Sequence, residues 1–197
     1  MSTSEVITLG SGADPVRLSF ARLFTPKAFR KDQTPRYEGT FLLDVTNKAH
    51  AATIAEIKAT TKALLTEHFG DKIPKGVVTC FGDGNTKEYD GYEGMFYISS
   101  SNKTRPNVVD RGRSPLAEAD GKPYSGCYVI GTITLWIMDN EFGRRVNANL
   151  RAVQFVKDGV AFGVKPVDAE EEFEKLEDDV EVNGNVAPSA ADKEDWE

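Results

Sequence analysis

The sequence is poor in the residue types that most often carry catalysis or bind metals. Its 197 residues include two histidines, His50 and His68, and two cysteines, Cys80 and Cys127. The histidines lie eighteen residues apart, so they cannot form the HExxH pair of a zinc peptidase. The sequence has no GxxxxGK[ST] phosphate loop and no serine or cysteine in a nucleophile elbow. We therefore expect no enzymatic activity, no metal site and no cofactor.

Long hydrophobic runs are also missing. A membrane-spanning helix needs about eighteen or more apolar residues in succession, and no such run is present, so we expect no membrane association. The first ten residues, MSTSEVITLG, lack the basic segment followed by an apolar segment that marks a secretory signal. Both cysteines lie inside apolar runs, which favours reduced core residues, with a disulfide as the alternative.

The net charge of −7 averages two different segments. Residues 168–197 hold 13 acidic residues and 2 lysines, a charge of −11. The preceding 167 residues hold 22 Lys+Arg and 18 Asp+Glu, a charge of +4. A basic body with an acidic tail is typical of a protein with a nucleic-acid surface, although acidic tails also serve solubility alone.

Apolar residues in the body alternate as they do in strands. Val16, Leu18 and Phe20 are predicted to share one face of a strand, and the segment 124–156 predicts a long hairpin with its turn at DNEFG. In the first strand of this hairpin, the residues predicted to face the core are Cys127, Val129, Ile133, Leu135 and Ile137.

One segment has helical spacing, residues 47–69, with Thr46 or Asn47 as N-cap and Gly70 as the stop. Six to eight strands with one helix and no βαβ rhythm predict a mainly β fold, a small antiparallel barrel with an inserted helix. We place a flexible leader at 1–14, the folded domain at 15–167, and a disordered acidic tail at 168–197, which has too little apolar surface to offset the entropy of ordering.

Two basic loops and one strand face predict a site for single-stranded nucleic acid. Basic side chains in loops suit phosphate contacts, and aromatic planes suit stacking of unpaired bases. The alternative is that the aromatic residues pack under the helix and the arginines form a solvated face. The predicted DNA-binding residues are Lys27, Arg30, Lys31 and Arg36 in the first loop, Lys103, Arg105, Arg111 and Arg113 in the second, and Tyr124, Tyr128, Trp136, Arg145 and Arg151 on the hairpin.

Four segments, RLSFARLFTPKAF, KTRPNVVD, YSGCYVIGTITLW and LRAVQFVKDG, resemble in this order the phage single-stranded DNA-binding family whose type member comes from an Enc-type enterobacterial phage. The resemblance spans about residues 16–166. It implies an OB-fold barrel, binding of single strands without sequence preference, no catalysis, a role in phage replication or recombination, and a location in the cytoplasm of the infected bacterial host.

The tail is similar in type to the acidic C-terminal segments of phage and bacterial single-strand binders, which end in an aromatic residue. That similarity implies recruitment of phage or host replication proteins, and competition with DNA for the protein's own groove. The residues we assign to partner binding are Asp192, Glu194, Asp195 and Trp196. Trp196 is penultimate here, whereas the family type ends on the aromatic residue itself.

The function favoured by the sequence is protection of single-stranded DNA and recruitment of replication proteins, with a homodimer as one possible assembly. The competing hypothesis is a non-catalytic interaction or assembly factor with a solubilising acidic tail. Quenching of aromatic fluorescence by an oligo-dT at low salt separates these two hypotheses.

Overall fold

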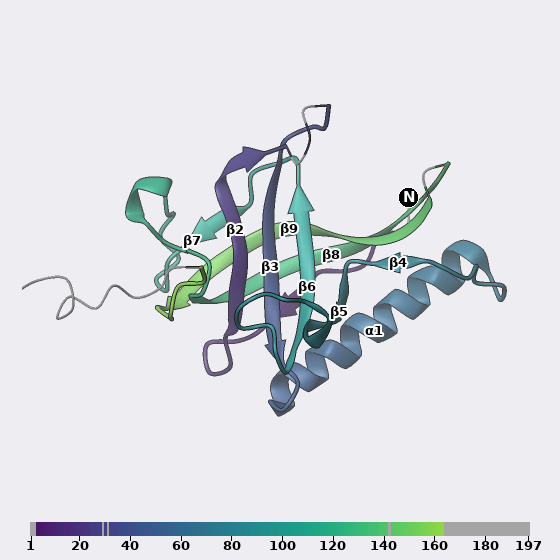
Figure 1. The fold of residues 1–197 in the computed structure, drawn as a ribbon, viewed down its shortest axis with the longest axis horizontal. Coiled ribbons are helices and arrows are strands. Elements are labelled where there is room, and N and C mark those ends of the chain that lie inside the picture. Colours follow the sequence, from purple (N-terminus) through teal and green to yellow (C-terminus); the bar gives the residue numbers. More distant parts are fainter. Residues whose placement is uncertain (1–2, 29, 31, 142, 164–197) are drawn as a thin grey trace, which may run out of the picture. The chain divides into compact units, whose positions relative to one another are not determined.

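The computed structural model describes residues 3–163 except 29, 31 and 142, and Figure 1 shows their arrangement. The described part consists mainly of strands with one long helix. The elements in chain order are β1 (Ile7–Leu9), β2 (Val16–Lys27), β3 (Arg36–Asp44), α1 (Lys48–Phe69), β4 (Val78–Thr79), β5 (Phe81–Asp83), the 3-10 turn η1 (Gly84–Thr86), β6 (Met95–Asn102), β7 (Asn107–Val109), the 3-10 turn η2 (Glu118–Asp120), β8 (Tyr128–Asn140) and β9 (Gly143–Lys157).

Five strands close into a ring in the order β2-β3-β6-β9-β8. Antiparallel pairing joins β2 to β3, β3 to β6, β8 to β9 and β8 to β2. The remaining seam, between β6 and β9, is parallel and has a single registered pair, Ser101 with Asn149. The fold is therefore an OB-like barrel that is partly open along one seam, and the prediction of a mainly β fold with one helix is confirmed.

The core lies inside this barrel and under α1. The residues of β8 predicted to face inward, from Val129 to Ile137, are buried, as is Cys127 just before the strand. Phe41 of β3 is fully buried because its ring occupies the space where Gly131 of β8 has no side chain. The helix contributes Ile54, Ile57 and Leu64 to the same cluster.

The ends of α1 follow the predicted caps. The Asn47 side chain accepts hydrogen bonds from the backbone N–H groups of Ala49 and His50, which satisfies two donors of the first turn. At the other end, the Gly70 N–H donates to the Thr66 carbonyl, and Gly70 has a positive φ of 67°. The described helix is not long and apolar enough to cross a membrane.

Two sequence predictions about the N-terminal part are wrong. The leader is not wholly flexible, because Ile7–Leu9 pair with Gly131–Ile133 on the edge of β8. Phe20 does not share the buried face of Val16 and Leu18: its exposed fraction is 41%. The register of β2 against β3 shifts between Ser19 and Arg22, so the alternation that buries Val16 and Leu18 breaks before Phe20.

Cys80 and Cys127 are both free, which settles the choice in favour of reduced thiols. The acidic tail predicted at 168–197, with its partner-binding residues, lies outside the described residues.

Candidate nucleic-acid interface

An open groove of about 470 Å³ crosses the outer face of the barrel. It runs from β2 over β3 and β6 to β9, so it spans the partly open seam. Residues from these strands and from two loops line it: Phe20, Arg22, Glu38, Thr40, Cys80, Tyr89, Ser99, Ser100, Ser101, Arg145, Asn147 and Ala148. We call this hollow the seam groove.

The floor of the seam groove is polar. On the outer face, Thr40 of β3 pairs with Ser99 of β6, and their hydroxyls form a hydrogen bond of 3.0 Å. At one side of the floor, the Arg22 guanidinium donates to the Glu38 carboxylate at 3.0 Å, and both side chains are about one-third exposed. Small hydroxyls beside a partly exposed ion pair leave hydrogen-bonding groups available to a ligand.

Two exposed aromatic residues stand at one end of the groove. Phe20, on the irregular part of β2, and Tyr89, in the loop before β6, lie edge to face with ring centroids 5.2 Å apart. Their exposed fractions are 41% and 54%. Exposed aromatic planes beside a polar groove are the arrangement on which unpaired bases stack.

The loop that carries Tyr89 is fastened to the sheet by Tyr92. Tyr92 is 2% exposed, and its hydroxyl hydrogen-bonds with the side chains of Ser19 and Thr40. Burial raises the pKa of the Tyr92 phenol, which therefore stays protonated and able to donate at neutral pH. The loop is also closed on itself, because the Gly94 N–H donates to the Asn85 side chain at 3.0 Å.

Basic residues predicted from the first loop continue from the groove toward the β2–β3 turn. The Arg36 guanidinium donates to the Ser101 hydroxyl at 3.4 Å, and Ser101 lines the groove. Lys27 pairs with Arg36 across the two strands, and the exposed Arg30 lies in the turn between them. Lys31 lies outside the described residues.

The second basic loop is divided between two places. Lys103 follows directly after β6 and is exposed, at the same end of the sheet as Arg36. Arg105 lies over the ring of Phe24 of β2, with its guanidinium carbon 5.3 Å from the ring centre.

The remaining arginines of that loop are remote from the groove. Arg111 and Arg113 are exposed beside Gln154, whose side chain donates to the Arg111 carbonyl at 3.2 Å. Gln154 is nine residues along β9 from Arg145, or about 30 Å at 3.3 Å per residue. The two predicted basic loops therefore do not form one continuous patch.

The hairpin residues are likewise divided. Arg145 lines the seam groove, and Trp136 shares its face because Trp136 pairs with Asn147. Trp136 is half-buried, and its ring nitrogen has no hydrogen-bond partner among the described residues. Arg151 is exposed where the register of β9 shifts, outside the groove lining.

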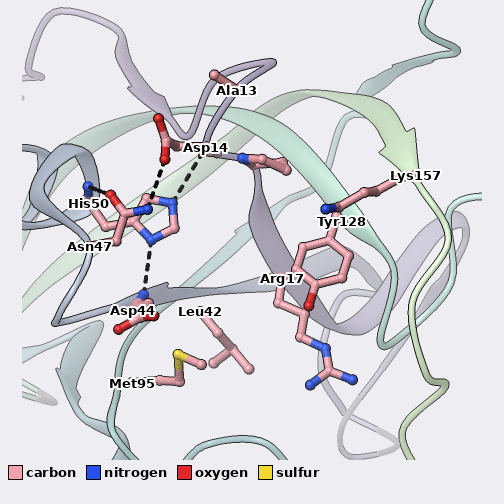
Figure 2. A pocket seen from close by; sticks show the side chains of 11 residues that line it. Ala13, Asp14, Arg17, Leu42, Asp44, Asn47, His50, Met95, Tyr128 and Lys157 are labelled. Atoms are coloured by element: carbon pink, nitrogen blue, oxygen red, sulfur yellow. Dashed lines mark hydrogen bonds between the residues drawn. The ribbon is translucent and has the colours of Figure 1, made fainter.

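The two hairpin tyrosines serve the fold in this structure. The Tyr124 hydroxyl donates to Asp158 at 3.0 Å, and its ring packs against the core. Tyr128 lies in a separate pocket between Arg17 and Lys157, with the Lys157 ammonium 4.7 Å from its ring centre (Figure 2). It is eight residues from Trp136 on β8, so the predicted aromatic face is spread over about 26 Å.

The polar side of that second pocket is also fully engaged in the fold. Figure 2 shows the His50 ring between two backbone groups: Nδ1 accepts from the Asp44 N–H at 3.0 Å, and Nε2 lies 3.1 Å from the Asp14 carbonyl. Because Nδ1 accepts, Nε2 carries the proton and donates to that carbonyl. The Asn47 side chain donates to Asp14 at 2.8 Å, so these groups tie the start of α1 to the loop before β2.

The described residues contain no group of three or more His, Cys, Asp or Glu side chains able to hold a metal ion. Burial raises the pKa of the Cys80 thiol to about 12, so this groove residue remains a neutral thiol near pH 7. The groove thus offers hydroxyl, amide and guanidinium groups for hydrogen bonding and aromatic rings for stacking.

Comparison with known proteins identifies the family. Residues 6–183 match the family model described as the ssDNA-binding protein of Enterobacter phage Enc34. The chain belongs to this family.

Similar proteins agree with the assignment. A protein designated p50, of Acyrthosiphon pisum secondary endosymbiont phage 1, is 42% identical over 170 residues, which cover 82% of this chain and 90% of that protein. The single-stranded DNA-binding protein from bacteriophage Enc34 in complex with ssDNA has a TM-score of 0.70 and 28% identity, over 80% of this chain and 89% of that one. The single-stranded DNA-binding protein encoded by bacteriophage T7, with a TM-score of 0.51 and 17% identity over 95% and 98% of the chains, shows the shared fold alone.

Sequence reasoning missed the two residues that end the groove. Strict alternation places Phe20 on the same face as Leu18, and nothing in the sequence marks the register shift that separates them. Tyr89 lies in the polar segment GDGNTKEYDGYEG, which is not among the residues predicted to bind DNA. A usable signal was present: this polar loop contains two tyrosines, and it has no apolar neighbours to bury both.

Proposed function

We propose that this protein binds single-stranded DNA without sequence preference along the seam groove, and that it serves phage replication or recombination in the cytoplasm of the infected host. The observation that carries the proposal is the groove itself. It combines a hydroxyl-lined floor, arginines on both sides and exposed aromatic rings at one end. Its family, and a relative described as in complex with ssDNA, support the same ligand.

Charge sets the expected strength of binding. The body carries a charge of only +4, so few phosphates are neutralised. With about four phosphate contacts, log K falls with log[salt] at a slope near −3, since each contact on a single strand contributes about −0.7. Binding is therefore moderate and sensitive to salt.

The acidic tail completes the proposal. Residues 168–197 carry −11 and compete with DNA for the basic groove. When DNA displaces the tail, Trp196 and the acidic residues beside it become available to a replication protein. A penultimate tryptophan is a side chain of the kind that anchors interfaces. Homodimer formation is compatible with this arrangement and is part of the proposal only as an assembly to be measured.

The test compares the DNA affinity of a variant that lacks two positive charges in the groove with that of a variant that lacks two positive charges elsewhere. Arg36→Ala combined with Arg145→Ala should weaken binding to dT, dC and mixed oligonucleotides alike, and should make the salt slope shallower by about 1.4, from two lost contacts. The matched control is Lys62→Ala with Lys72→Ala, which removes two exposed cations from α1 and the turn after it.

Fluorescence anisotropy over a series of salt concentrations measures both quantities. Equal losses in the groove and control variants would place the contacts outside the groove. Failure of the wild-type chain to bind any oligonucleotide at low salt would favour the assembly-factor hypothesis.

A further inference from the structure

Phe20 and Tyr89 are the two exposed aromatic residues in the part of the chain that the structure describes, with exposed fractions of 41% and 54%. The rings of Phe24, Tyr97 and Tyr128 are each covered by a cation, from Arg105, Lys87 and Lys157 respectively. Within the described part of the chain, no lysine or arginine lies over Phe20 or Tyr89 in this way. From this and the features below, we propose that Phe20 and Tyr89 form a stacking subsite for an unpaired nucleobase.

The position of the pair fits such a ligand. Both residues line the seam groove, and both also line a neighbouring hollow of about 280 Å³ whose other walls include Ser125 and Phe162. The pair therefore separates two open spaces.

The geometry of the pair forms a corner. The ring planes are inclined by 79°, with the edge of one ring directed at the face of the other. A flat base that stacks on one ring then contacts the second ring with its edge. Stacking of this kind tolerates any base, because every base has a π face.

The backbone of Phe20 supports a role in binding rather than in packing. Its φ is 50°, in the left-handed region that a bulky side chain rarely adopts, and it lies where the register of β2 shifts. Glycine would adopt this conformation without strain. A strained residue that points a large apolar ring toward solvent is the pattern found at ligand contacts.

Tyr89 is held in place before any ligand arrives. Its ring packs edge to face on Tyr92, with centroids 5.3 Å apart, and Tyr92 is buried and hydrogen-bonded to the sheet. A ring fixed in this way loses little conformational freedom when a base stacks on it. The subsite is thus preorganised on a rigid support.

This inference rests on the proposed function, and the experiment separates the two. The full chain, with Phe20→Leu and Tyr89→Leu variants, is titrated against a labelled dT 12-mer and against an abasic oligonucleotide of the same length. Leucine keeps apolar bulk and removes the ring plane. Tyr89→Phe keeps the plane and is the matched control.

Each leucine variant should lose about 5- to 150-fold in affinity for dT, the equivalent of roughly 1–3 kcal/mol per stacked base. Affinity for the abasic strand should change less than twofold, and Tyr89→Phe should bind dT like the wild type. If wild type binds neither oligonucleotide, the proposed function fails. If wild type binds dT and both leucine variants bind it equally well, the stacking subsite is refuted while the function stands.

A second measurement needs no variant and so does not depend on variant folding. An oligonucleotide containing 5-iodouracil is crosslinked to the wild-type chain by light, and the modified peptides are identified by mass spectrometry. Crosslinks at Phe20 or Tyr89 support the subsite. Crosslinks confined to other aromatic residues, such as Tyr97 or Trp136, would overturn it.

Discussion

In a strand, a glycine variant is usually less stable than an alanine variant. The backbone conformation of Phe20 predicts the opposite order of stability at this position. In an extended strand, glycine is less stable than alanine by about 0.5–1 kcal/mol, because it loses more conformational freedom on folding. At φ = 50° a residue with a Cβ atom instead pays a penalty of about 1–2 kcal/mol that glycine avoids. The balance favours Phe20→Gly over Phe20→Ala by about 0.5–1 kcal/mol.

Phe20→Gly and Phe20→Ala both lack the aromatic ring. The stability lost with the ring is therefore the same in both variants and cancels when their free energies of unfolding are compared. The matched control is Ser99→Gly against Ser99→Ala on the outer face of β6, where both changes remove the same hydroxyl and the strand is regular. There we expect the ordinary order, with alanine more stable by about 0.5–1 kcal/mol.

Urea unfolding followed by circular dichroism measures the difference. With a denaturant slope near 2 kcal/mol/M, the midpoint of Phe20→Gly should lie about 0.3–0.5 M above that of Phe20→Ala. The two variants should bind dT equally weakly, because both lack the ring. A midpoint for Phe20→Ala above that of Phe20→Gly would show that residue 20 has an ordinary backbone conformation, and the strain argument would fall.

Three further predictions concern the groove and the tail. Tyr92→Phe removes the hydroxyl that bonds to Ser19 and Thr40, so the free energy of unfolding in urea should fall by about 1–2 kcal/mol; an unchanged value would mean that the hydroxyl does not anchor the loop. Removal of the residues after 167 deletes a charge close to −11 and should raise affinity for oligo-dT in anisotropy titrations; unchanged or weaker affinity would contradict competition by the tail. Cys80, with a pKa raised by burial to about 12, has about one thiolate in ten thousand at pH 8, so iodoacetamide should alkylate it far more slowly than glutathione; rapid alkylation would show that the thiol is not buried.

Much of the fold could be predicted because local patterns and tertiary packing agree. In β8 the residues predicted to face inward, Val129, Ile133, Leu135 and Ile137, are all buried, although Thr134 of the opposite face is buried as well. The ends of the helix could be predicted from Asn47 and Gly70. The Asn47 side chain caps the first turn and the Gly70 backbone adopts a positive φ, and both effects are local. Such signals need no knowledge of distant parts of the chain.

The features that could not be predicted depend on partners far away in sequence. The pairing of Ile7–Leu9 requires the free edge of β8, more than 120 residues away. The exposure of Phe20 depends on how β2 meets β3, because one irregular step reverses which residues face the core. Tyr89 acquires its place only because Tyr92 docks on Ser19 and Thr40. Basic residues were recognised by type, but their grouping around Arg36, and not around Arg111, follows from strand register.

The position of the seam groove follows from the way the barrel closes. The parallel strands β6 and β9 share only the pair Ser101 and Asn149, so a complete ladder does not form between them. On one side of that pair Cys80 bridges the strands, since its N–H donates to the Val146 carbonyl and its carbonyl accepts from Ser99. Ser99 and Asn147 consequently face a hollow rather than each other. A fully paired seam would bring these polar side chains together and remove the groove, so the incomplete closure of the barrel creates the space in which we propose that a strand of DNA binds.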